Sequence, residues 1–332
     1  MHVEIPKEKQ LEEKVFTINN EKDFAIIALE VYQFQFENNL LYQDYCNAVG
    51  KAPQSVREIT DIPFLPISFF KTHRVETTAF DPELVFNSSG TTGSVTSCHF
   101  VKDASLYMRS FTAGFRQFYG DIKEYCIIGL LPSYLERGNS SLVYMVDHLI
   151  KASGHPHSGF YLNEFEQLDY TLKKLQSTKQ KTILVGVTYA LLDFSSCYQQ
   201  NLQNTILMET GGMKGRGTEM TREELHDQLK KNFGVSEIHS EYGMTEMLSQ
   251  AYGVDGKMRY PPWLSILLRD ETDPFSIYKS GSGVINIIDL ANLYSSSFIA
   301  TDDMGMISGD GSFEILGRID NSDIRGCSLM VV

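Results

Sequence analysis

Residues 83–94 read Glu-Leu-Val-Phe-Asn-Ser-Ser-Gly-Thr-Thr-Gly-Ser, a short apolar run that leads into a loop of glycine and hydroxyl residues. The eight residues 87–94 hold five hydroxyl side chains and two glycines. Glycine lets a backbone approach a phosphate closely, and hydroxyl and backbone N–H groups donate to phosphate oxygens. No Gly-Lys-Ser/Thr follows, so this is not a Walker loop. The stretch predicts a strand that ends in a phosphate-binding loop, with a flexible surface turn as the alternative.

The sequence around this loop alternates between apolar runs and helical segments. Strand-like runs occur at Leu84–Phe86, Cys126–Leu131, Ile183–Val187 and Ile206–Met208. Helical patterns occur near 103–118, 141–152, 164–176, 189–198 and 221–232. The last of these begins with a capping box, Thr221 with Glu224, and ends before Gly234. This alternation predicts an α/β protein with a mainly parallel sheet and helices on both faces.

Both ends of the chain depart from this pattern. The first 50 residues look helical, with Asn20 as a cap and apolar positions that recur from Phe24 to Gly50. Residues 59–70 contain two prolines in an apolar run, which predicts an extended connector packed on the core. After residue 250, short runs separated by Gly, Asp and Ser predict an antiparallel, barrel-like subdomain. These runs are Leu264–Leu268, Val284–Asp289, Ser296–Ala300 and Ser312–Leu316. We expect a helical segment at 1–60, an α/β core at 61–250 and a β-rich subdomain with tail at 251–332.

Composition excludes several classes of protein. The 332 residues carry 29 Lys and Arg against 42 Asp and Glu, a net charge of −13, which argues against sequence-independent binding of nucleic acid. No apolar stretch approaches the roughly 18 residues of a membrane-spanning helix. The N-terminus lacks the apolar core and cleavage site of a signal peptide. Five widely spaced cysteines without a Cys-x-x-Cys pair predict reduced thiols in a cytoplasmic protein.

Three further motifs follow the glycine and hydroxyl loop in a fixed order. They are Glu209-Thr210-Gly211-Gly212, then Tyr242-Gly243-Met244-Thr245-Glu246, then Thr301-Asp302-Asp303-Met304-Gly305 with Gly317-Arg318-Ile319-Asp320. Together the four resemble the nucleotide-binding motifs of the adenylate-forming superfamily, which includes acyl-CoA synthetases and firefly-type luciferases. The resemblance implies the large N-terminal domain of that fold. It also implies that ATP with Mg²⁺ activates a carboxylic acid as acyl-AMP.

The resemblance also implies roles for individual residues. Thr245 would touch the α-phosphate and Glu246 would hold Mg²⁺ as a hard oxygen ligand. Asp303 would accept hydrogen bonds from the ribose hydroxyls, with Arg318 assisting. Tyr242 would flank adenine. The other residues implied at the nucleotide are the phosphate-loop residues Ser88, Ser89, Gly90, Thr91, Thr92, Gly93 and Ser94, and the glycines Gly211, Gly212 and Gly243.

The tail narrows the resemblance. The chain ends twelve residues after Asp320, where most superfamily members continue into a mobile lid with a catalytic lysine. The tail, residues 318–329, and the segments 61–66, 131–137 and 185–188 resemble the acyl-protein synthetase of the bacterial bioluminescence fatty-acid reductase complex (LuxE-type). That family implies a fold without the lid and a fatty acid that passes from acyl-AMP to a cysteine. Cys327 occupies the matching place, and a reductase or an acyl carrier protein would receive the acyl group.

Some features depart from the family pattern or leave alternatives open. The phosphate loop lacks the usual Pro-Lys, so Lys102, Arg109 or Mg²⁺ alone would compensate the phosphate charge. A lone cysteine such as Cys327 is alternatively a small buried hydrophobe. An acyl-CoA or acyl-carrier-protein ligase and a non-catalytic nucleotide-binding protein remain alternative functions, and the acid is not specified. The weakest predictions place four residues in the acid pocket: His99, Tyr134, Gly186 and Thr188.

Overall fold

The computed structural model describes residues 6–88, 95–131, 139–162, 164–211 and 220–319. The chain begins with α1 (Lys7–Val15), α2 (Glu21–Asn38) and α3 (Leu40–Ala48). Asn20 caps α2 as predicted, because its side chain accepts from the Asp23 N–H at 2.9 Å. In the region whose pattern looks helical up to Gly50, α2 and α3 are separate helices. Asn39 is extended, with φ −119° and ψ 99°, and its side chain caps α3 by accepting from Tyr42 N–H.

The predicted connector joins the helices to the core. It holds η1 (Ile59–Asp61), β1 (Leu65–Pro66) and α4 (Phe69–Thr72), and β1 pairs in parallel with β14 (Phe298–Ile307). A separate hairpin follows, made of β2 (Leu84–Asn87) and β3 (Cys98–Val101). The predicted glycine and hydroxyl loop therefore leaves the end of one strand and returns on its antiparallel neighbour.

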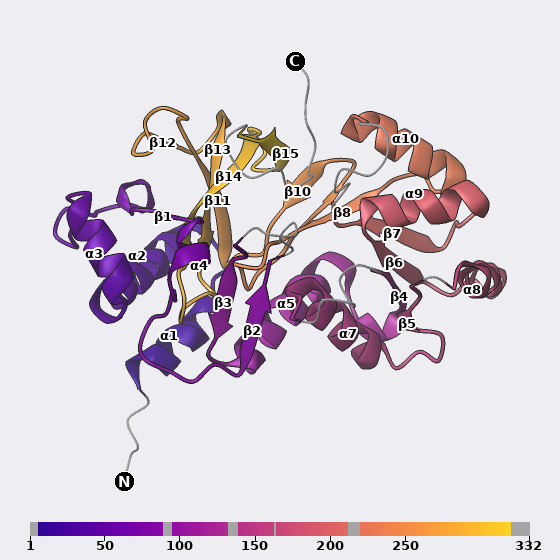
Figure 1. Cartoon of the computed structure of the whole chain (residues 1–332), viewed down its shortest axis with the longest axis horizontal. Coiled ribbons are helices and arrows are strands. Elements are labelled where there is room, and N and C mark those ends of the chain that lie inside the picture. Colours follow the sequence, from indigo (N-terminus) through magenta and orange to yellow (C-terminus); the bar gives the residue numbers. More distant parts are fainter. Residues whose placement is uncertain (1–5, 89–94, 132–138, 163, 212–219, 320–332) are drawn as a thin grey trace, which may run out of the picture.

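The α/β part follows the predicted alternation. Its parallel strands are β4 (Cys126–Leu130), β5 (Gly159–Phe160), β6 (Thr182–Gly186), β7 (Thr205–Glu209) and β8 (His239–Tyr242). Its helices are α5 (Ala104–Tyr119), η2 (Ile122–Glu124), α7 (Ser141–Ser153), α8 (Phe165–Ser177), α9 (Thr188–Cys197) and α10 (Arg222–Phe233). Figure 1 shows α9 and α10 on one side of these strands and α5 and α7 on the other. Every residue of β4 and β6 is buried, as expected for strands covered on both faces.

The antiparallel strands predicted after residue 250 continue the same sheet. They are β9 (Ala251–Val254), β10 (Lys257–Arg259), β11 (Leu264–Arg269), β12 (Ile277–Tyr278), β13 (Gly281–Asp289), β14 and β15 (Phe313–Arg318). The order of the sheet is β12-β11-β13-β14-β15-β10-β9-β8-β7-β6-β4-β5. Within the described residues β12 and β5 are its two ends, so the barrel-like closure that the sequence predicted is not part of this hydrogen-bonding pattern. The fold is thus a mixed α/β sheet flanked by helices (Figure 1).

A buried connection, Asp289–Ser297, links β13 to β14, and we call it the strap. All nine of its residues are buried, although most of them carry polar side chains. Gln35 of α2 holds it from one side, since its side chain donates to the Leu293 carbonyl at 2.9 Å and accepts from the Ser297 N–H at 3.0 Å. Buried backbone groups need such partners because water cannot reach them.

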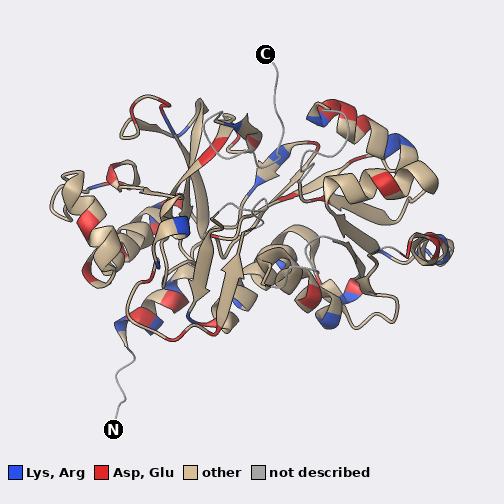
Figure 2. Cartoon of the chain, in the orientation of Figure 1, with Lys and Arg blue, Asp and Glu red and all other residues tan. Residues whose placement is uncertain are grey.

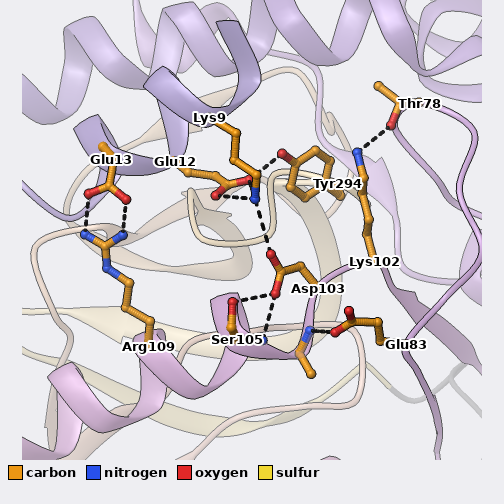
Figure 3. A network of polar contacts seen from close by, with 11 residues as sticks. Lys9, Glu12, Glu13, Thr78, Glu83, Lys102, Asp103, Ser105, Arg109 and Tyr294 are labelled. Carbon is orange, nitrogen blue, oxygen red and sulfur yellow. Dashed lines mark hydrogen bonds and ion pairs between the residues drawn. The ribbon is translucent and has the colours of Figure 1, made fainter. Parts of the chain in front are cut away.

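The first helix is tied to the start of α5 by a second polar network, which we call the α1 clamp (Figure 3). Lys9 Nζ donates to Asp103 Oδ2 at 3.3 Å and pairs with Glu12, which in turn accepts from the Tyr294 hydroxyl. Asp103 also caps α5 through the Ser105 N–H. The remaining contacts of the network lie at Glu13 with Arg109, Glu83 with the Ala104 N–H, and Lys102 with Thr78.

The surface carries both signs of charge. Figure 2 shows acidic and basic residues interleaved along the outer helices. In α10 the acids Glu223 and Glu224 stand in the first turn and Lys230 and Lys231 in the last, which matches the helix dipole. Across the ranges that the structure describes, no helix combines the length and apolar character that crossing a membrane requires.

Candidate functional site

Three sequence motifs that lie far apart in the chain meet at the end of β8. The Tyr242 hydroxyl donates to Asp303 Oδ2 at 2.8 Å, and Arg318 Nε donates to Asp303 Oδ1 at 2.7 Å. Asp303 lies on β14 directly opposite Arg318 on β15. Asp303 is buried, and Arg318 is partly exposed. The predicted adenine-flanking tyrosine and the predicted ribose pair therefore form one hydrogen-bonded cluster.

The Thr245–Glu246 turn follows the same strand and is anchored through its backbone. The Thr245 carbonyl accepts from His99 Nδ1 at 2.8 Å. The Glu246 carbonyl accepts from Asn292 Nδ2 at 2.8 Å, and Glu246 is 4% exposed. Two residues further on, Asp289 accepts from the N–H groups of Leu248 and Ser249 at 2.8 and 2.9 Å. His99 of β3 therefore holds the Thr245 end of the turn, and the strap holds the Glu246 end and the residues after it.

Only the ends of the predicted phosphate loop are described. Ser88 N–H donates to the Ser97 carbonyl at 3.0 Å, and the Ser97 N–H donates to Ser88 Oγ at 2.9 Å. Cys98 Sγ donates to Asn87 Oδ1 at 2.9 Å. These bonds fix where the loop leaves and rejoins the hairpin. The intervening Ser89, Gly90, Thr91, Thr92, Gly93 and Ser94 lie outside the described residues.

A second group of predicted residues surrounds Glu209 at the end of β7. Glu209 is buried, and it accepts from the Gly211 N–H at 2.7 Å, from Ser240 Oγ at 2.6 Å and from Thr188 Oγ1 at 3.4 Å. Burial alone would raise the pKa of Glu209. His226, Ser240 and the Gly211 N–H outweigh that burial and lower the pKa of this carboxyl. Glu209 thus joins the ends of three neighbouring strands.

The four residues predicted for the acid pocket have different surroundings. Gly186 ends β6, and a Cβ there would lie 2.7 Å from the Leu191 side chain, so close packing requires glycine. Thr188 is 2% exposed and bonded to Glu209. His99 is 1% exposed, with both ring nitrogens in contact with protein. Tyr134 lies outside the described residues, as do Gly212 and Cys327.

The two cations considered for charge compensation are engaged elsewhere. Lys102 Nζ lies 4.0 Å from the centre of the Tyr294 ring and 3.4 Å from Thr78 Oγ1. Arg109 pairs with both carboxylate oxygens of Glu13, at 2.7 and 3.0 Å (Figure 3). In this arrangement both side chains belong to the α1 clamp and its surroundings rather than to the nucleotide motifs.

Three further residues were not anticipated from the sequence. Asp289 and Asn292 anchor the Thr245–Glu246 turn, and both are fully buried. Glu241 precedes Tyr242, and burial, together with the charge of Glu209, raises the pKa of the Glu241 carboxyl to about 8. The sequence signal that could have identified such residues is an acidic or amide side chain inside an apolar run, because such side chains are rarely buried without a partner.

Comparison with protein families gives a match over nearly the whole chain. The family model described as "Acyl-protein synthetase, LuxE" matches residues 12–332. One curated relative is the long-chain-fatty-acid–luciferin-component ligase of Aliivibrio fischeri. It is 22% identical over 330 residues, which cover 90% of this chain and 85% of the relative.

Solved structures share the fold. 2-Hydroxyisobutyryl-CoA ligase, in an open conformation with 2-HIB-AMP and CoA, superposes with a TM-score of 0.67 at 14% identity, covering 91% of this chain and 76% of that one. ATP-bound MatB from Rhodopseudomonas palustris gives a TM-score of 0.52 at 17% identity, covering 70% of this chain and 47% of that one. At these identities the likeness establishes the fold of adenylate-forming ligases.

Proposed function

The chain belongs to the LuxE family of acyl-protein synthetases, and from that premise we propose that it activates a long-chain fatty acid with ATP and transfers the acyl group to a protein thiol. The observation that carries the proposal is the cluster of Tyr242, Asp303 and Arg318 at the end of β8. An adenosine needs a flanking ring and a carboxylate acceptor for its ribose hydroxyls, and this cluster supplies both. The Thr245–Glu246 turn follows on the same segment, where the phosphates would continue.

In the first half-reaction a carboxylate oxygen of the acid attacks the α-phosphorus of ATP. A new C(O)O–P bond forms, the bond from the α-phosphorus to the bridging oxygen breaks, and pyrophosphate leaves. Ser88 and the loop that follows it hold the phosphates, Thr245 donates to the α-phosphate, and Asp303 with Arg318 orients the ribose. Because the chemistry requires little covalent help from protein, most of the rate enhancement comes from this positioning.

The residues at the turn fit a magnesium ion. Mg²⁺ is commonly held by one or two carboxylates together with substrate phosphates. Glu246 supplies a hard oxygen donor from a turn whose backbone is fixed at both ends. When bound there, the ion neutralises phosphate charge. Fixing the backbone of Glu246 limits the positions that its carboxylate can occupy.

In the second half-reaction a thiolate attacks the acyl carbon, a thioester forms and AMP leaves. We assign the thiol to Cys327, from its place in the family. Two of the four described cysteines are poor alternatives, because burial raises the pKa of the Cys46 thiol to about 12 and that of the Cys126 thiol to about 11. A thiol attacks as its thiolate, so both are poor nucleophiles at neutral pH.

The proposal also includes the cofactors, the acyl acceptor and the cellular compartment. ATP and Mg²⁺ are the cofactors, a reductase or an acyl carrier protein receives the acyl group, and the protein works in the cytoplasm. The absence of disulfide-type cysteine spacing supports the compartment. The net charge of −13 supports a protein partner rather than a nucleic acid.

The test is intact-protein mass after incubation with Mg-ATP and a panel of fatty and aryl acids. We expect a gain equal to one acyl group that hydroxylamine removes, together with release of pyrophosphate. Cys327→Ser should abolish the mass gain and keep pyrophosphate release. Cys197→Ser is the matched control, because Cys197 is an exposed thiol at the end of α9, and it should behave like the unsubstituted chain.

Other outcomes would reassign the function. Acyl transfer to added coenzyme A, with no gain in protein mass, would indicate an acyl-CoA ligase. ATP binding in calorimetry without pyrophosphate from any acid would indicate a non-catalytic nucleotide-binding protein. A stable acyl label on Cys327→Ser would contradict the assignment of the acceptor, and peptide mapping would locate the true one.

A further inference from the structure

The buried side chains of His99 and Asn292 contact the backbone of Thr245 and Glu246, the residues proposed to bind phosphate and magnesium. His99 contacts the Thr245 carbonyl at 2.8 Å and Asn292 donates to the Glu246 carbonyl at 2.8 Å. His99 is 1% exposed and Asn292 is 0% exposed. Neither residue carries a role in the chemistry proposed above, yet each fixes the backbone of a residue that does.

The geometry fixes the orientation of the Asn292 amide. Its Nδ2 donates to the Glu246 carbonyl and to the Ser296 carbonyl, both at 2.8 Å. A carbonyl can only accept, so the amide nitrogen must face this pair. Its Oδ1 therefore faces His99 Nε2, at 3.1 Å. The contacts run in a closed ring from Thr245 through His99 and Asn292 to Glu246.

The geometry also fixes where the His99 proton lies. Burial lowers the pKa of His99 to about 4, so the ring is neutral and has one N–H. Both ring nitrogens face acceptors, the Thr245 carbonyl at 2.8 Å and Asn292 Oδ1 at 3.1 Å, and a neutral ring can donate to only one of them. The shorter contact places the proton on Nδ1, so the contact between Nε2 and Asn292 Oδ1 is a packing contact and not a hydrogen bond. The edge of Phe70, with ring centroids 5.8 Å apart, packs against the imidazole.

His99 connects the hairpin that carries the phosphate loop with Thr245, which lies 146 residues further along the chain. It lies on β3 opposite Phe86 of β2, one residue pair from the strand ends that carry the phosphate loop. The bonds between Ser88 and Ser97 close those ends. A shift of the hairpin would therefore be transmitted through the imidazole to the Thr245–Glu246 turn.

We propose that His99 and Asn292 are positioning residues of the adenylation step, which hold the Thr245–Glu246 turn in register with the phosphate loop. The inference rests on the proposed function, since it concerns the same nucleotide site. A backbone displacement of about 1 Å at such a turn is enough to lower turnover by about 100-fold. A role confined to the adenylation step predicts that the Michaelis constant for the acid changes little.

Substitutions at His99 separate its two contacts. His99→Asn retains a donor near the Nδ1 position and should restore the bond to the Thr245 carbonyl. His99→Gln extends its amide toward the Nε2 position and reaches Asn292 instead. We expect His99→Ala to lower kcat for pyrophosphate release by about 10- to 100-fold, with KM for the acid unchanged within about threefold. His99→Asn should recover most of kcat and His99→Gln should not.

Asn292→Ala tests the other half of the ring. Loss of the Glu246 carbonyl contact should raise the Mg²⁺ concentration needed for half-maximal rate, again with KM for the acid unchanged. Because the two residues touch, the double variant should lose less than the product of the two single effects. His148→Ala, a half-buried histidine packed on Phe111 in α5, is the control and should retain the kcat of the unsubstituted chain.

Three results would overturn the inference. The first is a folded His99→Ala with unchanged kcat, with folding checked by urea denaturation. The second is an equal loss of activity in His99→Asn and His99→Ala. The third is a change confined to KM for the acid. If no acid yields pyrophosphate with the unsubstituted chain, the proposed function fails instead. Calorimetry with ATP, with and without Mg²⁺, then tests the positioning role. That role predicts that Mg²⁺ raises the affinity for ATP less in His99→Ala than in the unsubstituted chain.

Discussion

The strap and the turn between β11 and β12 each centre on an aspartate that accepts hydrogen bonds from backbone N–H groups and a hydroxyl group. Asp289 accepts from two backbone N–H groups and the Ser249 hydroxyl, at 2.8, 2.9 and 2.6 Å. Asp270 accepts from two backbone N–H groups and the Thr272 hydroxyl, at 2.7, 3.1 and 2.6 Å. Yet burial raises the pKa of Asp289 to about 6, whereas the hydrogen bonds lower the pKa of Asp270.

The difference teaches that burial, and not the number of hydrogen bonds, sets the energetic weight of these two carboxyl groups. At the turn around Asp270, water replaces any hydrogen bond that is lost, so breaking one changes the free energy of unfolding little. Inside the strap no water replaces them, and each unpaired group bears its full desolvation cost. The function proposed for the Thr245–Glu246 turn depends on the second kind of contact.

Removing the buried carboxylate should have the largest effect on stability. Asp289→Ala leaves two backbone N–H groups and the Ser249 hydroxyl without their acceptor, so we expect the free energy of unfolding at pH 7 to fall by about 4 kcal/mol. Asp270→Ala removes the acceptor of a similar donor set from a site that water reaches, and it is the matched control, with a much smaller fall. Urea denaturation of both variants measures the difference. Equal losses would contradict the role assigned to burial.

Sequence alone distinguishes the two aspartates only in part. Asp270 stands among polar residues, in Arg269-Asp270-Glu271, whereas Asp289 stands between Ile288 and Leu290. An acid in an apolar run indicates burial. The partners of Asp289 lie 40 and 41 residues earlier, however, and no local pattern identifies them. The same reason explains why the role of His99 was not foreseen.

Regular local structure was predicted more completely. Helix patterns and caps gave α5 and α7 to α10 within about two residues, including the Thr221 capping box. The strand β8 was missed because its residues, His-Ser-Glu-Tyr, are polar and do not form an apolar run. The nucleotide motifs were recognised by resemblance. Their convergence at Asp303 required the pairing of β14 with β15 and lay beyond any local signal.

Gln35 provides the next largest effect, because it supports the strap from α2. The side chain is fully buried, and its loss leaves the Leu293 carbonyl and the Ser297 N–H unpaired. We expect Gln35→Ala to lower the free energy of unfolding by about 3 kcal/mol. Gln33→Ala is the control, because Gln33 is exposed on the same helix. A loss for Gln35→Ala no greater than the control would contradict the importance of the strap.

The pH dependence of stability tests the effect of burial at Glu241, because burial raises the pKa of its carboxyl to about 8. A raised pKa means that the folded state favours the protonated form. Its stabilising contribution is present below the unfolded pKa of about 4.5 and is lost as the pH rises toward 8. Glu241→Gln should therefore equal the unsubstituted chain near pH 4.5 and exceed it by about 2 kcal/mol at pH 8, allowing for partial exposure.

The matched control for this titration is Glu237→Gln, an exposed carboxylate just before β8. Thermal or urea unfolding at several pH values measures the free energy of each variant. A Glu241→Gln variant that loses stability with rising pH in parallel with the unsubstituted chain would contradict the assignment of the raised pKa.

The ion pair between Arg109 and Glu13 in the α1 clamp should give the smallest effect, because water reaches both side chains. Arg109 and Glu13 form a two-pronged pair at 2.7 and 3.0 Å, but their side chains are 40% and 69% exposed. Arg109 also lies 4.3 Å from the centre of the Phe16 ring. Exposed pairs contribute about 0–1 kcal/mol, and salt screens them. Arg109→Ala should therefore lower the free energy of unfolding by less than about 1 kcal/mol.

Salt separates the two parts of that small effect. The charge contribution should shrink as NaCl rises from about 0.05 to 0.5 M, where the screening length falls to a few ångströms, while the packing of the guanidinium on Phe16 should persist. Glu13→Gln removes the ion pair and leaves Arg109 on the ring, so it isolates the charge contribution. A loss above about 2 kcal/mol, or one insensitive to salt, would mean that the clamp behaves like the strap. Burial would then no longer explain why chemically similar contacts differ in strength.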